Sequence, residues 1–241
     1  EADSIIEYTN EDQGVIIALS GSDPDGDVLF FSLENDATNG SVTIEGSLAS
    51  YIPNVDFNGN DSFSYTVSDG EYISSADVSV SISAVNDAPE LTSTADVFFD
   101  EDTSVSISLS ANDVDEDDLI FSITGGNNII AALEGSDVTF SAPADYNGSE
   151  EFTVTVTDDD LTDTQAIIVT VNAVNDAPVA NATSGTTSED QSVVIALSGS
   201  DIDGDVLVFS LENITENGSL NIDGSFATYI PDSNYNGNDE F

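Results

Sequence analysis

The 241-residue sequence contains no lysine, arginine, histidine, cysteine, methionine or tryptophan. Its 48 aspartate and glutamate residues give a formal net charge of −48. Without basic side chains, the chain cannot replace the counterions of nucleic-acid phosphates or bind an anionic membrane surface by charge. It also lacks the usual general bases, thiol nucleophiles, Schiff-base amines, disulfides and zinc ligands. The composition therefore predicts no nucleic-acid partner and argues against an enzyme.

Long hydrophobic runs are also missing, since no segment approaches the roughly 18 apolar residues of a membrane-spanning helix. We therefore expect no membrane insertion. A chain that starts at Glu1 and has no methionine is expected to be a processed chain or an internal piece of a longer protein. Apolar residues still make up 39% of the sequence, with 12 Phe and 7 Tyr, which favours packed cores over disorder.

Four motifs recur along the chain at intervals of about 89 residues, which is the period expected of tandem domains. They are a Glu-Asp pair (Glu11–Asp12, Glu101–Asp102, Glu189–Asp190), an acidic cluster (Asp23–Asp27, Asp113–Asp117, Asp201–Asp205), an Asn-Gly block (Asp56–Gly59, Asp145–Gly148, Asn234–Gly237) and Val-Asn-Asp-Ala-Pro (Val85–Pro89, Val174–Pro178). The motifs divide the chain into repeats 1–89, 90–178 and 179–241. Because Phe241 matches Phe63, the third repeat is expected to lack its last two strands.

Each repeat has the pattern of a β protein. Short segments rich in Val, Ile, Phe and Tyr alternate with polar residues and are separated by Asn-Gly, Asp-Gly and Gly-Ser turns. In Ala76–Val85, for example, Val78, Val80 and Ile82 alternate with serines. No stretch has convincing helical periodicity. Roughly seven strands in about 90 residues predict an all-β fold of tandem Greek-key β-sandwiches of immunoglobulin-like type.

Taken together, the motifs resemble bacterial cadherin-like tandem repeats, which occur in large secreted or cell-surface proteins, including RTX-type adhesins. The resemblance rests on Glu-Asp, Asp-x-Asp-Gly-Asp-x-Leu, Tyr-x-Pro-x-x-Asp-Phe-Asn-Gly-x-Asp-x-Phe-x-Tyr-x-Val-x-Asp-Gly and Val-Asn-Asp-Ala-Pro, and it covers essentially the whole chain. It implies Ig/cadherin-like sandwiches arranged end to end, with Ca²⁺ held at each junction. The composition agrees, because Ca²⁺ takes oxygen ligands from carboxylates, amides and backbone carbonyls.

The resemblance also implies a ligand set for each junction. For the first junction the matching residues are Glu11, Asp12, Asp56, Asn58, Asn86, Asp87, Asp113 and Asp115, and for the second they are Glu101, Asp102, Asp145, Asn147, Asn175, Asp176, Asp201 and Asp203. Asp117 and Asp205 complete the same acidic loops. Asp23, Asp25 and Asp27 are expected to serve a junction with a repeat that precedes Glu1. The Asp-Phe-Asn-Gly block stands where animal cadherins have Leu-Asp-Arg-Glu.

Other interpretations of the acidic loops remain open. Asp23–Asp27 begins like an EF-hand loop with Glu34 at the twelfth position, but Val28 stands where that loop needs glycine. Asp and Asn also favour turns without any ligand. In the second repeat, Glu116 and Asp118 replace the Gly and Val of the other repeats, so this loop is expected to bind differently or to hold an additional ion.

These observations predict a Ca²⁺-stiffened stalk or fibre segment of a large extracellular or cell-surface adhesin-like protein. A glycosidase with paired carboxylates would need a cleft with aromatic platforms, which short repeats without Trp do not suggest. The expected partners are neighbouring repeats of the same protein, with identical chains in a fibre or a cell-surface ligand as further candidates. Two alternative functions are a filament subunit completed by strand donation between chains, and a Ca²⁺-dependent module that binds a glycan or a protein.

Overall fold

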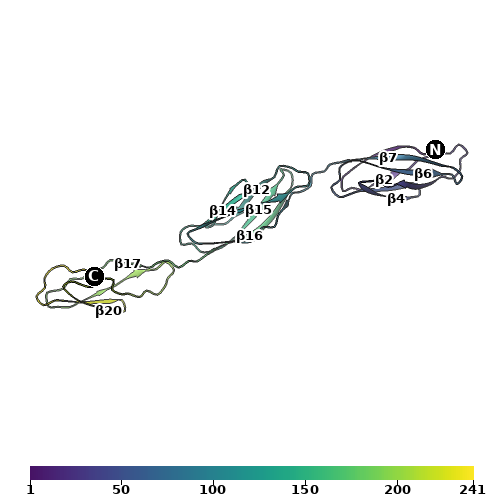
Figure 1. Cartoon of the computed structure of the whole chain (residues 1–241). Helices are drawn as coiled ribbons and strands as arrows, with labels where there is room; N and C mark the ends of the chain where they lie inside the picture. Colours follow the sequence, from purple (N-terminus) through teal and green to yellow (C-terminus); the bar gives the residue numbers. More distant parts are fainter. The chain divides into compact units, whose positions relative to one another are not determined.

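The computed structural model describes residues 1–241 and consists of strands, turns and bends (Figure 1). None of its elements is a helix, so no helix in it is long and apolar enough to cross a membrane. The all-β fold predicted from the sequence is confirmed.

The chain forms two compact units. The first comprises Glu1–Thr94, Leu109–Ile123 and Thr153–Gln165, and the second comprises Ala95–Ser108, Thr124–Phe152 and Ala166–Phe241. Each unit contains one Val-Asn-Asp-Ala-Pro linker together with acidic loops that precede and follow it in the sequence. Each linker and its acidic groups therefore lie within a single unit.

Residues 1–89 contain seven strands. They are β1 (Ile5–Asn10), β2 (Val15–Ala18), β3 (Phe30–Asn35), β4 (Gly40–Glu45), β5 (Leu48–Pro53), β6 (Gly59–Ser68) and β7 (Ile73–Ser83). One sheet has the order β1-β7-β6-β3 and the other β2-β5-β4. β1 runs parallel to β7, whereas β3 and β7 both pair with β6 in antiparallel fashion. The β6–β7 hairpin therefore forms the centre of the larger sheet.

The core of this repeat lies between the two sheets. Side chains on alternate positions point inward, as the strand period of two requires. The buried residues are Ile17, Leu19, Val42, Ala49, Tyr51, Phe63, Tyr65, Val67, Val78, Val80 and Ile82. More than half of them come from the β6–β7 hairpin, and full burial of one such side chain stabilises a fold by about 1.5–3 kcal/mol. The hairpin is thus a major source of the stability of the repeat.

Residues 90–178 repeat this arrangement. The strands are β8 (Glu90–Leu91), β9 (Val97–Asp100), β10 (Ser104–Ser108), β11 (Ala111–Asn112), β12 (Ile120–Gly125), β13 (Ile130–Glu134), β14 (Asp137–Ser141), β15 (Gly148–Thr157) and β16 (Thr162–Asn172). The larger sheet has the order β12-β15-β16-β9, with β16 parallel to β9, and the smaller has the order β10-β14-β13. β8 and β11 form a short additional ladder.

Residues 179–241 contain only a part of the sandwich. Their strands are β17 (Val179–Ala180), β18 (Val193–Ala196), β19 (Gly199–Ser200), β20 (Gly218–Asp223) and β21 (Phe226–Pro231). The sheet β18-β21-β20 matches β2-β5-β4 of the first repeat, and β17 pairs with β19. The larger four-stranded sheet has no counterpart here.

Candidate metal centres at the two linkers

Glu11 connects three segments at the first linker. It follows β1 directly and only 3% of its surface is exposed. Its Oε1 accepts a hydrogen bond from the backbone amide of Val85, and its Oε2 accepts one from Nδ2 of Asn58 at 3.3 Å. The Glu11 amide donates to the carbonyl of Ser83. This carboxylate therefore holds the end of β1, the start of the linker and the Asn-Gly block together.

Acidic side chains from separate segments converge around Asp87. Carboxylate oxygens of Glu11, Asp87 and Asp115 lie within 4.8 Å of one another, as do those of Asp12, Asp56 and Asp87. The Asp87 amide donates to Oδ2 of Asp115 at 2.8 Å. Asp87 belongs to both groups, so one linker residue joins the carboxylates on either side of it in the sequence. The structure thus brings together five of the eight residues that the resemblance implied for the first junction.

A third group lies in the loop that contains Asp113, Asp115 and Asp117, whose carboxylate oxygens also lie within 4.8 Å of one another. The amide of Asp115 donates to Oδ1 of Asp113 at 2.9 Å. Nearby in the same unit, Nδ2 of Asn86 donates to Oδ2 of Asp158 at 2.9 Å. Asp158 is absent from the predicted ligand set, because from the sequence a plain turn explains Asp158, and Asp69 at the matching position in the first repeat, as well as a ligand does.

Two oxygens at the first linker are buried without a hydrogen-bond partner, namely Oδ2 of Asp87 and Oδ2 of Asp113. Burial and the nearby carboxylates, with Asp56 and Asp115 foremost, raise the pKa of Asp87. Burial together with Asp113 and Asp115 likewise raises the pKa of Asp117. A buried anionic oxygen without a partner is costly. In a chain without Lys, Arg or His, only a cation from solution or a proton can neutralise these groups.

The second linker repeats this chemistry. Carboxylate oxygens of Glu101, Asp176 and Asp203 lie within 4.8 Å of one another, as do those of Asp102, Asp145 and Asp176. Glu101 is buried and accepts a hydrogen bond from the Val174 amide. Oδ2 of Asp176 is buried and unpartnered, and burial followed by the charges of Asp145 and Asp203 raises the pKa of Asp176. The two linkers therefore share the two groups that meet at Asp87 and at Asp176, whereas the group of Asp113, Asp115 and Asp117 has no counterpart among Asp201, Asp203 and Asp205.

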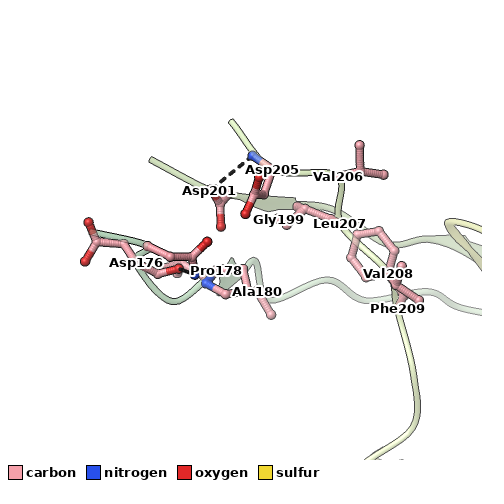
Figure 2. Close-up of a pocket in the computed structure, with 12 residues that line it drawn as sticks. Asp176, Pro178, Ala180, Gly199, Asp201, Asp205, Val206, Leu207, Val208 and Phe209 are labelled. Carbon is pink, nitrogen blue, oxygen red and sulfur yellow. Dashed lines mark hydrogen bonds between the residues drawn. The ribbon is translucent and has the colours of Figure 1, made fainter. Parts of the chain in front are cut away.

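Some predicted ligands lie apart from these groups. The amides of Asp25 and Asp27 donate to Oδ1 of Asp23, which makes a local turn. The amide of Asp205 donates to Oδ1 of Asp201 at 3.1 Å, and both residues line a groove beside the second linker (Figure 2).

The two asparagines of the second linker's predicted set also differ from their counterparts. Nδ2 of Asn175 donates to the carbonyl of Asp176, whereas Nδ2 of Asn86 reaches both the carbonyl of Asp87 and Asp158. Asn147 is exposed. The asparagine side chains therefore make different contacts at the two linkers, whereas the carboxylates around Asp87 and Asp176 are grouped in the same way.

The donor set fits a hard divalent cation. Ca²⁺ takes six to eight oxygen ligands, and each linker offers several carboxylates together with amide and backbone oxygens. The buried, unpartnered oxygens of Asp87, Asp113 and Asp176 are available to a cation without the loss of a hydrogen bond. No nitrogen or sulfur ligand for a softer metal is present in the chain.

Comparison with known proteins gives a family match over most of the chain. A family model described as a bacterial Ig domain matches residues 1–82, 86–170 and 175–241. No curated protein sequence matches the chain.

The solved structures share the fold at low sequence identity. The extracellular cadherin domains 1–5 of Protocadherin Gamma B2 match 96% of this chain and 52% of their own length, with 15% identity and a TM-score of 0.58. The extracellular domain of Protocadherin GammaB4 matches 94% of this chain and 42% of its own length, with 15% identity and a TM-score of 0.53. The endo-fucoidan hydrolase MfFcnA4 matches 71% of this chain and 28% of its own length, with 21% identity and a TM-score of 0.32.

The chain thus spans about half or less of each of these three structures. At such identities the protocadherin likeness shows the fold alone. Together with the family match, it confirms the resemblance to bacterial cadherin-like tandem repeats.

Proposed function

Because the chain belongs to the bacterial Ig domain family, we propose that it is a structural segment of an extracellular or cell-surface adhesin-like protein. Its repeats are residues 1–89, 90–178 and 179–241. Ca²⁺ bound at the linkers stiffens the connection between successive repeats. The observation that carries this proposal is the buried, unpartnered oxygen of Asp87 and of Asp176, each among carboxylates from segments on both sides of a linker.

At the first linker, Glu11, Asp12, Asp56, Asp87 and Asp115 hold the cation. Asn58 and Asn86 can add neutral oxygens, and Asp113, Asp117 and Asp158 serve a further ion. Glu101, Asp102, Asp145, Asp176 and Asp203 hold the cation at the second linker. When bound, Ca²⁺ supplies positive charge that no side chain of this protein can supply.

The stiffening follows from electrostatics. Carboxylates within 4.8 Å of one another repel when they are ionised. Without the cation, this repulsion favours conformations in which the linker and the acidic loops separate. Because Ca²⁺ binds the assembled arrangement, it stabilises that arrangement by mass action. The same groups recur at both linkers, which favours a structural role over catalysis at one site.

The experiment compares the chain in Ca²⁺ and in EDTA. We expect a higher melting temperature and a narrower distribution of conformations in Ca²⁺, measured by calorimetry and small-angle X-ray scattering. The variant Asp87→Asn should reduce both effects at the first linker. Glu45→Gln removes one exposed carboxylate on β4 and serves as the matched control. In this variant, the effects of Ca²⁺ on the melting temperature and on the scattering should be unchanged. Identical melting and scattering in Ca²⁺ and EDTA would refute the proposal.

A further inference from the structure

Asp145, a member of one acidic group at the second linker, has a left-handed backbone with a φ of 57°. Residues other than glycine rarely adopt this conformation, and it persists only where the surroundings hold it in place. On one side, the Asp145 amide donates a 3.2 Å hydrogen bond to Oδ1 of Asp102, which belongs to the same group. On the other side follows Tyr146, so the contacts of Tyr146 also determine where the Asp145 carboxylate lies.

The ring of Tyr146 lies against the backbone of the Asn-Gly block. A Cβ added at Gly148 would lie 2.9 Å from the Tyr146 hydroxyl oxygen and 3.3 Å from its ring carbon Cζ. The hydroxyl donates a 3.2 Å hydrogen bond to Oε1 of Glu150. Both side chains are partly buried. The hydroxyl therefore ties the block that begins at Asp145 to the carboxylate of Glu150.

Glu150 is itself anchored to a loop that reaches the core. Its carboxylate accepts hydrogen bonds from the backbone amides of Asn127, Asn128 and Ile129 at 2.6, 3.0 and 3.1 Å. Hydrogen bonds to an ionised carboxylate are about twice as strong as those between neutral groups. Ile129 is only 2% exposed, which fixes the loop to the interior. A chain of contacts therefore connects the core of the second repeat to its Asn-Gly block.

The first repeat connects its matching carboxylate, Asp61, in a different way. There the hydroxyl comes from Tyr51, which is fully buried on β5 and donates a 3.0 Å hydrogen bond to Oδ2 of Asp61. The Asn-Gly block of this repeat has Phe57, which carries no hydroxyl. In the second repeat the same two positions hold Phe140 and Tyr146. Each repeat thus has one bond between a tyrosine and this carboxylate, but only in the second does it hold the Asn-Gly block.

We propose that Tyr146 and Glu150 are positioning residues for the cation site of the second linker. Through these two side chains, the loop of residues 127–129 holds Asp145 in the arrangement that binds the cation. Groups that orient a metal ligand without touching the metal affect its affinity. The first linker lacks this connection because Phe57 has no hydroxyl. The inference rests on the proposed function, since it takes the second linker as a cation site.

The test follows a Ca²⁺ titration of the full chain by NMR, with the amide signals of Asp87 and Asp176 as reporters for the two linkers. In Tyr146→Phe we expect the midpoint at Asp176 to rise by about tenfold, as is typical when the partner of a metal ligand is removed. The midpoint at Asp87 should be unchanged. Tyr72→Phe is the matched control, because Tyr72 is 71% exposed, and it should leave both midpoints unchanged.

A triple variant separates positioning from stability. Phe140→Tyr, Tyr146→Phe and Glu150→Asp together give the second repeat the residues of the first at these three positions. The carboxylate then has a hydroxyl partner again, but on the core strand β14 instead of the Asn-Gly block. We expect the free energy of unfolding in urea to recover relative to Tyr146→Phe. The Ca²⁺ midpoint at Asp176 should stay about tenfold higher than in the original chain.

Hydrogen exchange gives a readout in the opposite direction, because coupling between two sites is reciprocal. In the original chain, Ca²⁺ should slow exchange at the amides of Asn127 and Asn128 by about fivefold or more. In Tyr146→Phe this effect should be lost. The amide of the fully buried Val138 reports on stabilisation of the whole repeat, so its response to Ca²⁺ should be the same in both proteins.

Three results would overturn the inference. They are an unchanged midpoint at Asp176 in Tyr146→Phe, equal shifts at Asp87 and Asp176, and recovery of both stability and midpoint in the triple variant. Any of these would leave the proposed function intact, provided that both reporters respond to Ca²⁺ in the original chain. If neither Asp87 nor Asp176 responds there, the proposed function is wrong and this inference fails with it.

Discussion

The backbone amide of Asp87 donates a 2.8 Å hydrogen bond to Oδ2 of Asp115, and the amide of Asp176 donates a 2.7 Å bond to Oδ2 of Asp203. In both cases a linker residue is tied to the acidic loop that follows it. The bond needs no cation, so it positions the two carboxylates before any ion binds. The same hydrogen bond between linker and acidic loop therefore occurs at both linkers.

Removal of the Glu11 charge should weaken cation binding at the first linker alone. We expect Glu11→Gln to lower Ca²⁺ affinity there by about tenfold or more, because the site loses a buried anionic ligand. Isothermal titration should resolve one weakened class of sites and one unchanged class. Glu189→Gln is the control, since the matching Glu189 is exposed. An equal effect of both substitutions would show that overall charge, and not the site, governs binding.

Asp61 should contribute to stability without binding a cation. This carboxylate is buried and accepts hydrogen bonds from the Thr38 and Asn39 amides and the Tyr51 hydroxyl. Asp61→Ala leaves these donors unpaired, so we expect a loss of about 1–3 kcal/mol in unfolding free energy. Urea unfolding in saturating Ca²⁺ measures it. The neighbouring exposed substitution Ser62→Ala should change stability little.

Glu150 should make stability depend on pH in acid. Burial opposes its ionisation, but the amides of Asn127, Asn128 and Ile129 donate to its carboxylate and together lower its pKa to about 2. The unfolded chain then binds the proton more readily, so this stabilisation is present above about pH 4.5 and is lost as the pH falls toward about 2.

Glu150→Gln provides the comparison for that pH effect. Unfolding measured between about pH 4.5 and pH 2 should show a smaller decline for the variant than for the original chain. An identical decline in both proteins would assign the acid sensitivity to other carboxylates.

The Tyr65 hydroxyl should anchor the first residues of the chain. It lies 2.6 Å from the carbonyl oxygens of both Asp3 and Ser20. Tyr65→Phe removes the donor, and we expect a cost of about 1–2 kcal/mol together with faster hydrogen exchange near Asp3. Tyr8→Phe is the control because Tyr8 is 68% exposed. Unchanged exchange near Asp3 would contradict this role.

The sequence alone was sufficient for the repeat period, the all-β class and most residues of the acidic groups. Val78, Val80 and Ile82 alternate with serines, and their burial follows from the strand period of two. Glu11, Asp87 and Asp115 recur at fixed spacing with Glu101, Asp176 and Asp203, and the resemblance that these motifs carry predicted that they group together at the two linkers.

Only the tertiary structure decided which distant groups meet. Asp158 reaches Asn86 because the β15–β16 turn folds back toward the linker, and no local pattern distinguishes that turn from the equivalent one at Asp69. Thr183–Ser188 matches β1 in position but is not a strand. The residues of a segment determine whether its apolar and polar side chains alternate as in a strand. The segment becomes a strand only when its backbone forms hydrogen bonds with a partner that is remote in sequence.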